Sequence, residues 1–342
     1  MSRLTFRTMC GWLGVAGVIA VWLAWAYSRF FPQDFIKTGP LYIAAEWVAF
    51  MVRTFWLHLG IAAVVAVVLV LIGRSRWRWG WAAAGAALAI IAAGPALYSA
   101  RPKDPPPISG RGTLRIVSAN VRFDNRQFDA VLDVLLAADA DVLILPEFTH
   151  AWHRATHERL AVAYPHFAHE LSDLPGALAV YSRVPFDQAV TTDIGGSLPH
   201  VPQMRTVVRI GGREVALYAI HLATPHVPSA ERRLQFAALL EQMRGEAIPG
   251  VAAGDFNFTD TSPQADALRE AEFRNTHDLA GRGFGHTWPA TGLRSWVITP
   301  DVRIDHVYLS PALTVVESRV IDLPGSDHRG IVAMVGLADA GR

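Results

Sequence analysis

Three long apolar stretches within the first hundred residues limit what this chain can fold into. They cover residues 11–27, 55–73 and 80–98, and none of them contains Asp, Glu, Lys or Arg. Each is 17 to 19 residues long, which is enough for an α-helix to cross the roughly 30 Å hydrocarbon core of a bilayer. The sequence therefore predicts a membrane anchor with three transmembrane helices over residues 1–100.

The charged residues divide the chain into two parts with opposite net charge. Residues 1–100 contain 8 Lys and Arg against 2 Asp and Glu, a net charge of +6, whereas residues 101–342 contain 23 against 28, a net charge of −5. The second part is long enough to form one large α/β domain with its own core. Because Cys10 is the single cysteine of the chain, a small scaffold held by disulfides is excluded.

Arginines beside the apolar stretches predict the orientation of the anchor. Arg74, Arg76 and Arg78 lie in the short loop between the second and third stretches, and Arg3 and Arg7 precede the first. Positive charges beside transmembrane helices mark the cytoplasmic side. We therefore expect a multi-pass protein of a bacterial inner or plasma membrane, with a cytoplasmic N-terminus and a periplasmic or extracellular globular domain.

The first apolar stretch has a second interpretation. Its Ala-Trp-Ala at residues 24–26 resembles the small-residue cleavage site of a signal peptide. Cleavage there would leave two crossings, which would still return the rest of the chain to the outside of the cytoplasm.

A proline-rich segment separates the predicted anchor from the globular domain. Residues 101–112 read RPKDPPPISGRG, a composition typical of a semi-rigid linker that extends by about 3.1 Å per residue. We therefore expect a linker of at most roughly 40 Å, which would keep a domain formed by residues 113–342 close to the outer leaflet.

Within residues 113–342, β-type and helical patterns alternate. The β-type runs are at residues 114–119, 142–145, 177–181, 206–210, 214–220, 251–253, 303–309 and 331–335. Helical patterns cover residues 127–138, 150–163, 229–244 and 262–271. Gly211-Gly212 between two β-type runs is typical of a hairpin turn. This order predicts mixed β-sheets covered by helices.

Polar residues follow or begin six of the predicted strands. They are Asn120, Glu147, His221, the pair Asp255 and Asn257, Asp305, and the pair Asp327 and His328. Each of them alone is ordinary, because turns and strand ends commonly carry Asn, Asp or Glu. Together they provide the carboxylates, amides and imidazoles that metal-dependent phosphoryl chemistry requires.

Three short motifs among these residues resemble those of a known superfamily. They are Gly-Asp-Phe-Asn at residues 254–257, Arg-Ile-Asp-His at 303–306 and Ser-Asp-His at 326–328. The chain resembles the endonuclease/exonuclease/phosphatase superfamily over about residues 113–336, with His306 in place of a tyrosine of the family pattern. That superfamily includes DNase I-like nucleases, neutral sphingomyelinases and inositol polyphosphate 5-phosphatases. The resemblance implies a four-layer α/β sandwich, two mixed β-sheets flanked by helices, with the active site at one end.

The resemblance also implies a metal-binding hydrolase. Oxygen ligands favour Mg²⁺ or Mn²⁺, and the globular domain has no cysteine that could hold zinc. By resemblance, Glu147 is the main metal ligand, and Asn120 and Asp327 contribute to the same metal site. The chemistry supplied by such an ion is polarisation of a phosphoryl oxygen.

The resemblance assigns catalytic roles to five further residues. Asp255 would position or deprotonate the attacking water, and Asn257 would orient the water or the phosphate. His328 would contact the phosphoryl group or exchange a proton, with its ring oriented by Asp305. His221 would donate a hydrogen bond to a phosphate oxygen. The sequence leaves open which of Asp255 and His328 is the general base.

Three substrate hypotheses remain from the sequence. The first is a membrane-anchored phosphoesterase that hydrolyses a phosphate mono- or diester, with a lipid-linked substrate and the bilayer as its surroundings. The layout resembles bacterial membrane proteins of the VanJ type. The second is a magnesium-dependent endo- or exonuclease, although the domain is acidic and has no lysine after Lys103. The third is a membrane sensor that binds a phosphorylated ligand without turnover. None of them requires an obligate protein partner.

Three more basic residues are weaker candidates for phosphate contacts. They are Arg205, His226 and Arg233, and we expect most such side chains to be simply solvated.

Overall fold

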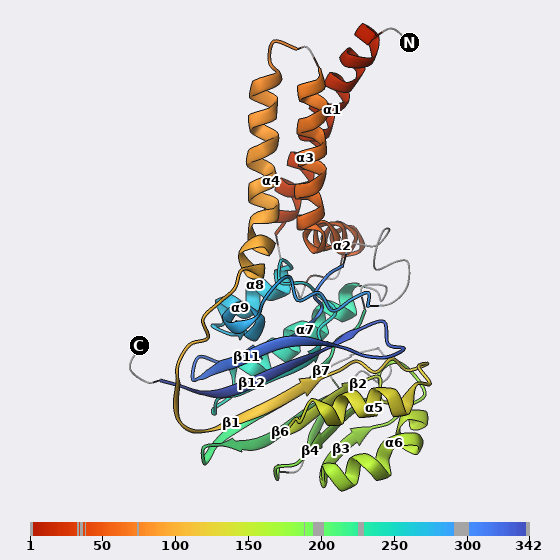
Figure 1. Ribbon diagram of the computed structural model, residues 1–342, viewed down its shortest axis with the longest axis vertical. Helices are drawn as coiled ribbons and strands as arrows, with labels where there is room; N and C mark the ends of the chain where they lie inside the picture. The colour runs from red at the N-terminus through yellow and green to blue at the C-terminus, as the bar shows by residue number, and fades with distance from the viewer. Residues whose placement is uncertain are drawn as a thin grey trace. The chain divides into compact units, whose positions relative to one another are not determined.

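The computed structural model describes residues 3–32, 34, 37, 39–73, 75–187, 189–193, 202–224, 229–290 and 301–339 (Figure 1). The chain forms two compact units. The first unit consists of Met1–Asp34, Thr38–Ser99 and Thr261–Pro263, and the second of Phe35–Lys37, Ala100–Asp260 and Gln264–Arg342.

The first unit is helical. Its elements are α1 (Arg3–Phe30), α2 (Pro40–Thr54), α3 (Trp56–Ile72) and α4 (Arg78–Ala100). Among the described residues, two helical segments are long and apolar enough to cross a membrane, Thr5–Phe30 and Arg78–Ala100. They contain the predicted spans at residues 11–27 and 80–98.

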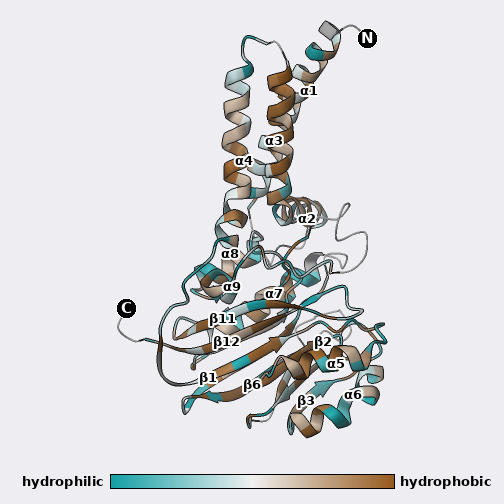
Figure 2. Cartoon of the chain, viewed as in Figure 1, coloured by the Kyte–Doolittle hydropathy of each residue, from teal (hydrophilic) through white to brown (hydrophobic). Residues whose placement is uncertain are grey.

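The middle predicted span, at residues 55–73, has a different form. Helix α3 has 17 residues and is apolar along its length (Figure 2), but it meets the criteria for a span only together with α2, from which it is bent by 71°. The described residues thus contain two candidate spans, or up to three if this bent pair counts as one. The third transmembrane helix stays a prediction.

The second unit contains two six-stranded sheets. The first has the order β11-β12-β1-β2-β4-β3 and the second β5-β6-β7-β8-β10-β9. The strands are β1 (Ile108–Ser118), β2 (Val142–Pro146), β3 (His166–Glu170), β4 (Leu178–Ser182), β5 (Val190–Asp193), β6 (Pro202–Ile210), β7 (Arg213–His221), β8 (Gly250–Asp255), β9 (Arg274–Asn275), β10 (Asp305–Leu309), β11 (Leu313–Asp322) and β12 (Arg329–Ala338). The helices are α5 (Phe128–Ala137), α6 (His150–Ala163), α7 (Ser229–Arg244), α8 (Pro263–Glu270) and α9 (Thr276–Ala280).

Both sheets are mixed, because β1 and β2 run parallel and β7 and β8 run parallel, whereas the other strand pairs are antiparallel. The predicted fold class, two mixed sheets flanked by helices, is confirmed. The predicted hairpin is also confirmed, since Ile210 pairs with Arg213 across Gly211-Gly212 and both glycines have the positive φ of a hairpin turn.

Strand β2 shows how the core is divided into layers. All five of its residues are buried. Val142 and Ile144 belong to the apolar cluster shared by the two sheets, and Leu143 and Leu145 belong to the cluster shared with α5 and α6. A strand that buries both faces reads as a continuous apolar run, which is why it was visible in the sequence. Figure 1 shows α5 and α6 over this part of the first sheet.

The structure also contains elements that the sequence patterns did not predict. They are β3, β5, β9, β11 and α9. Strand β1 begins at Ile108, which pairs with Ala338, so the last five residues of the predicted linker at residues 101–112 belong to a strand. The linker differs from the prediction because β12 extends far enough for Ala338 to pair with Ile108, and regular pairing resumes at Thr113 after an irregularity.

Gly254 allows β7 and β8 to approach each other directly before the strand ends. Its φ is +153°, and a Cβ at this position would lie 1.8 Å from the carbonyl oxygen of Ile220. Since that oxygen belongs to the neighbouring backbone, the side chain of any other residue would force the two parallel strands apart. The glycine of the Gly-Asp-Phe-Asn motif is therefore required by the sheet itself.

We expect Gly254→Ala to lower the free energy of unfolding by roughly 3 kcal/mol, because it combines overpacking with backbone strain. Gly245→Ala is the matched control, since the nearest atom to a Cβ there lies at an ordinary 3.4 Å. Urea unfolding of the purified protein measures both. Equal stability of the two variants would contradict this account of the motif.

Candidate active site

Parallel strand pairs bring four of the predicted residues to one edge of each sheet. In the first sheet, the ends of β1 and β2 lead directly to Asn120 and Glu147. In the second sheet, His221 at the end of β7 is in register with Asp255 at the end of β8. The carboxyl ends of parallel neighbours lie at the same edge of a sheet, so the topology places each pair side by side.

Antiparallel neighbours bring the remaining residues to the same end. Asp305 begins β10 and is in register with Asp255. His328 directly precedes β12, whose first residues run beside the end of β1 in register Ser118 with Ile331. Strand direction thus explains why the Asp305 and His328 motifs stand before their strands while the others stand after theirs.

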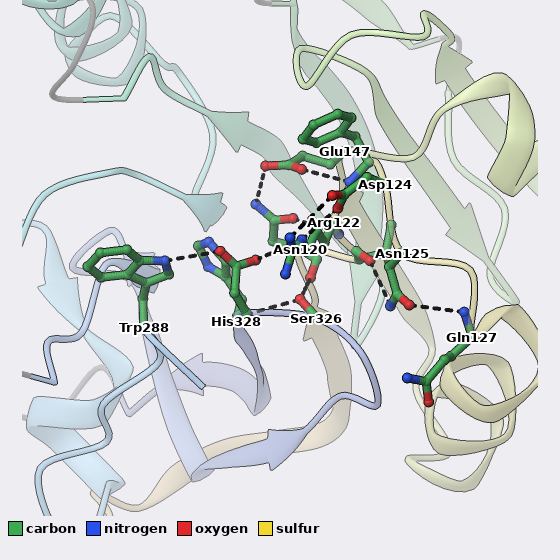
Figure 3. Close-up of polar contacts among 12 residues, drawn as sticks. Asn120, Arg122, Asp124, Asn125, Gln127, Glu147, Trp288, Ser326 and His328 are labelled. Atoms are coloured by element: carbon green, nitrogen blue, oxygen red, sulfur yellow. Dashed lines mark hydrogen bonds and ion pairs between the residues drawn. The ribbon is translucent and has the colours of Figure 1, made fainter. Parts of the chain in front are cut away.

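Asn120 joins the two sheets through its side-chain amide, and Figure 3 shows its contact with Glu147 of the first sheet. Its Nδ2 donates to Glu147 Oε1 at 3.0 Å and to Asp255 Oδ2 at 3.1 Å. Its Oδ1 accepts from the backbone N–H of Arg122, and the Ser326 hydroxyl donates to its carbonyl oxygen. Because Asn120 is completely buried, these contacts hold the carboxylates of Glu147 and Asp255 at fixed positions on opposite sheets.

His328 and Asp305 form a buried pair. His328 Nδ1 lies 2.9 Å from Asp305 Oδ2, and His328 Nε2 lies 3.8 Å from Asp255 Oδ2. Burial disfavours the charged ring, but the carboxylates of Asp305 and Asp255 outweigh it and raise the pKa of His328 to about 10. The ring is therefore an imidazolium at neutral pH, with Nδ1 directed to Asp305.

Asp255 lies at the centre of the cluster. Its Oδ1 accepts from the backbone N–H of Asn257 at 2.9 Å. Burial first, and then the charge of Asp305, raise the pKa of Asp255. His221 Nε2 lies 3.9 Å from Asp255 Oδ2, and burial lowers the pKa of His221, which favours the neutral ring. Asp255 Oδ2 thus lies near two imidazoles, of which His328 is favoured in the charged form and His221 in the neutral form.

Local backbone geometry directs three side chains of the site. Glu147 and Asn257 have φ values of +63° and +51°, and Arg122 has +63°. Left-handed backbone at residues other than glycine is uncommon and tends to occur at functional sites. Glu147 Oε2 accepts from the backbone N–H of Phe123 at 2.8 Å, and Asn257 Nδ2 donates to the carbonyl oxygen of Leu222. These contacts fix the side chains after the strands have ended.

Asp327 lies at the rim of this cluster. Its side chain is 37% exposed, and its carboxylate contacts Arg122 Nε at 3.8 Å and Trp288 Nε1 at 3.3 Å. Arg122 in turn contacts Asn120, because its backbone N–H donates to Asn120 Oδ1. The structure therefore brings seven of the eight predicted residues into one buried or half-buried group, with Asp327 beside it.

Arg122 is a residue of this site that the sequence did not reveal. Its guanidinium contacts both carboxylate oxygens of Asp124, at 2.6 and 3.2 Å, and lies near Asp327. Its carbonyl oxygen accepts from Trp152 Nε1. The only available signal was its position two residues after Asn120, which is a weak one because arginines are common in this domain.

The weaker phosphate candidates have other surroundings. Arg205 forms two hydrogen bonds with Glu246, at 2.7 and 3.0 Å, and Arg233 is buried and donates to the carbonyl oxygen of Lys37. Neither contact is to a residue of the candidate active site. His226 lies outside the described residues.

The donor set fits a hard divalent cation. Carboxylates of Glu147, Asp255, Asp305 and Asp327 gather at one end of the sandwich, and the buried Asp305 Oδ1 has no hydrogen-bond partner among the described residues. Oxygen-rich groups of this kind suit Mg²⁺ or Mn²⁺.

Two different residue sets of this site could hold the cation. Asp255, Asp305 and His328 offer ligand atoms within 4.8 Å of one another. The set implied by the resemblance was Glu147, Asn120 and Asp327, which lies beside it and shares the Asn120 bridge to Asp255.

Comparison with protein families supports the fold. The model of the Endonuclease/Exonuclease/phosphatase family matches residues 117–328. No curated protein sequence matches this chain.

Solved structures share the architecture at low sequence identity. An endonuclease/exonuclease/phosphatase from Beutenbergia cavernae DSM 12333 is 24% identical with a TM-score of 0.53, over 67% of this chain and 73% of that one. D. rerio TDP2 complexed with single strand DNA product is 20% identical with a TM-score of 0.56, over 66% of this chain and 100% of that one. The human Nocturnin catalytic domain with bound sulfate anion is 17% identical with a TM-score of 0.52, over 67% and 96%. These similarities establish the fold.

We expect Asp305→Asn to lower the pKa of the His328 ring from about 10 toward its ordinary value of 6.5, because the variant removes the nearest negative charge. NMR titration of the ring nitrogens in metal-free protein measures this pKa. Asp322→Asn is the control, since Asp322 is 91% exposed and pairs with Arg329. An ordinary His328 pKa in the unsubstituted protein would contradict the geometry.

The same pair has a consequence for stability. The folded pKa of about 10 lies above the ordinary value of 6.5, so the contribution of the pair is fully present below about pH 6.5 and is lost as the pH rises through about 10. We expect Asp305→Asn to flatten this dependence in metal-free unfolding measurements made between pH 6.5 and 10. An unchanged slope would contradict the pairing.

Proposed function

Because this chain belongs to the endonuclease/exonuclease/phosphatase family, we propose that it is a membrane-anchored, divalent-metal-dependent phosphoesterase whose catalytic domain faces away from the cytoplasm. Its substrate is a phosphate mono- or diester linked to a lipid. The observation that carries the catalytic part is the buried cluster in which Asn120 bridges Glu147 to Asp255 and His328 pairs with Asp305.

Glu147, Asn120 and Asp327 hold Mg²⁺ or Mn²⁺ in this proposal. When bound, the cation polarises a phosphoryl oxygen and offsets the negative charge that develops on it. Glu147 is directed to the site by its own backbone conformation and by the Phe123 N–H. Asn120 keeps this carboxylate beside the second sheet, where the reacting groups lie.

Asp255 is the general base in this proposal, because the carboxylates of Asp305 and Asp255 favour the protonated ring of His328, which is the alternative group. His328 carries a proton on each ring nitrogen at neutral pH, so it donates from Nε2 to a phosphoryl oxygen and cannot accept a proton from water. Burial and the charge of Asp305 raise the pKa of Asp255 to about 8, so its ionised form increases as the pH rises towards that value and is a stronger proton acceptor than an ordinary aspartate. Asn257 is placed beside it by a backbone contact and orients the water or the phosphate.

Two cationic or donor groups complete the contacts to phosphate. His221 donates from a ring nitrogen to a phosphate oxygen, and its backbone is held by hydrogen bonds to both ends of the Gln203 amide. Arg122 adds a fixed positive charge at the rim, and a guanidinium matches the geometry of phosphate oxygens. Such donors stabilise charge that increases in the transition state.

The membrane part of the proposal is supported by the helical unit. Thr5–Phe30 and Arg78–Ala100 are long enough to span a bilayer, and the arginines between the second and third apolar stretches favour a cytoplasmic loop. A domain tethered to a bilayer meets lipid headgroups at high effective concentration. This layout, which resembles bacterial proteins of the VanJ type, favours a lipid-linked phosphate in cell-wall lipid metabolism.

A nuclease is the second candidate. D. rerio TDP2, which has the same fold, was solved with a single-stranded DNA product. The charge of residues 101–342 argues against this function, because nucleic-acid binding depends on Lys and Arg and these residues carry a net charge of −5 with no lysine after Lys103.

We expect the purified full-length protein to release phosphate from undecaprenyl pyrophosphate in detergent when Mg²⁺ is present. His328→Ala and Asp255→Ala each reduce turnover by at least about a hundredfold, the usual effect of losing an acid–base group. Asp322→Asn is the matched control and keeps the activity. Phosphate release that is independent of His328 and Asp255 would contradict the site.

Other substrates separate the alternatives. Nicking of plasmid DNA without phosphate release from the lipid would favour the nuclease. Tight binding of a phosphorylated lipid without any product over hours would favour a sensor.

We expect the catalytic domain to be accessible from outside intact cells. In a Cys10→Ser background, a membrane-impermeant maleimide labels Asp322→Cys, whose side chain is 91% exposed, in intact cells. It labels the exposed Ser75→Cys between α3 and α4 only after permeabilisation. The reverse labelling pattern would contradict the proposed topology.

A further inference from the structure

Histidines are concentrated in one short part of the second unit. Five of the 13 histidines of the chain lie within residues 150–169. His153 and His157 are four residues apart on α6, so they lie on the same face of the helix, one turn apart. His169 is on β3, the edge strand of the first sheet. None of these three residues belongs to the candidate active site, and nothing in the proposed mechanism uses them.

The three imidazoles converge. One ring nitrogen of each lies within 4.8 Å of those of the other two. The rings of His153 and His157 are stacked at 4.2 Å, and the His153 ring meets the edge of His169 at 4.9 Å. Nitrogen ligands of one tetrahedral zinc ion, each about 2.0–2.1 Å from the metal, are about 3.4 Å apart. Side-chain rotations that move the ring nitrogens by about 1 Å therefore suffice to bring all three nitrogens to one ion.

Tyr181 fixes the orientation of one ring. His157 Nδ1 lies 2.8 Å from the Tyr181 hydroxyl, and Tyr181 is completely buried on β4, in register with Phe167 of β3. Burial raises the pKa of Tyr181, so the hydroxyl stays neutral. With Nδ1 occupied by this contact, Nε2 is left for a ligand. Histidines that bind metals commonly have the second ring nitrogen hydrogen-bonded in this way.

The surroundings favour neutral rings at neutral pH. Burial first, and then the neighbouring His157 and His169, lower the pKa of His153, and burial followed by His169 lowers that of His157. Neutral imidazole is the form that binds metals. All three residues are half-buried, so water retains access to the point where the rings meet.

We propose that His153, His157 and His169 form a second metal site, which binds a borderline transition-metal ion such as Zn²⁺ and is distinct from the oxygen-rich catalytic centre. The trio offers three nitrogen atoms and no carboxylate, a donor set that favours Zn²⁺ or Cu²⁺ over Mg²⁺. Water occupies the remaining coordination position. The ion links α6 to β3 and so stabilises an edge strand that has a neighbour on one side only.

Co²⁺, whose visible absorption reports on its ligands, is the probe for this site. It is titrated into the purified full-length protein with excess Mg²⁺ to occupy the catalytic centre, and is then displaced by Zn²⁺. We expect one Co²⁺ to bind. His157→Ala and His169→Ala each weaken binding by at least about a hundredfold, and Tyr181→Phe weakens it by about ten- to a hundredfold, the range found for partners behind a metal ligand.

Two controls make the result specific. His166→Ala changes a histidine of the same strand whose side chain lies on the opposite face, against Phe186, and it keeps the affinity. Glu147→Gln changes the catalytic centre and leaves the affinity for Co²⁺ unchanged. A protein that binds no Co²⁺ in the presence of Mg²⁺ would overturn the proposal, as would loss of binding in Glu147→Gln.

Thermal unfolding separates a lost ligand from a lost fold. Zn²⁺ raises the melting temperature of the unsubstituted protein and of His166→Ala, because a ligand bound only to the folded state stabilises it. His157→Ala and His169→Ala unfold cooperatively without metal but show no such increase. An equal increase in all four proteins would overturn the assignment of these ligands.

Discussion

The hydrogen bonds donated by one buried amide hold the candidate site together. Asn120 Nδ2 reaches a carboxylate on each sheet, Glu147 on the first and Asp255 on the second. A buried carboxylate without partners is costly by several kcal/mol, so the two sheets can bring these groups together only if a donor stands between them. The parallel pairs β1–β2 and β7–β8 place these three side chains close enough for this contact.

The second constraint is charge. Asp255 and Asp305 are both buried and in register on adjacent strands, where two negative charges repel each other. His328 reduces this repulsion because its two ring nitrogens lie 2.9 Å from Asp305 and 3.8 Å from Asp255. In the proposed mechanism, the His328 imidazolium is the proton donor and Asp255 is the proton acceptor. Stability and the proposed chemistry thus depend on the same contacts.

Sequence patterns predicted those parts of the structure that depend on neighbouring residues along the chain. Continuous apolar runs revealed β2 and β8, and the polar residues after them revealed Glu147 and Asp255. Strand β11 was missed because an irregularity between Val315 and Glu317 interrupts its alternation.

Features that depend on three-dimensional contact were not predictable. These include the amide bridge of Asn120, the position of Arg122, the bend between α2 and α3, and the contact of His169 with a helix that precedes it in the chain.

The central claim is that Glu147 holds a divalent cation beside the buried cluster. Its most direct test is the affinity of the full-length protein for Mn²⁺, measured by electron paramagnetic resonance. The account predicts one Mn²⁺ that Mg²⁺ displaces, with affinity at least about tenfold weaker in Glu147→Gln and unchanged in Glu317→Gln, which alters an exposed pair with Arg319. Equal affinity in all three proteins would contradict it.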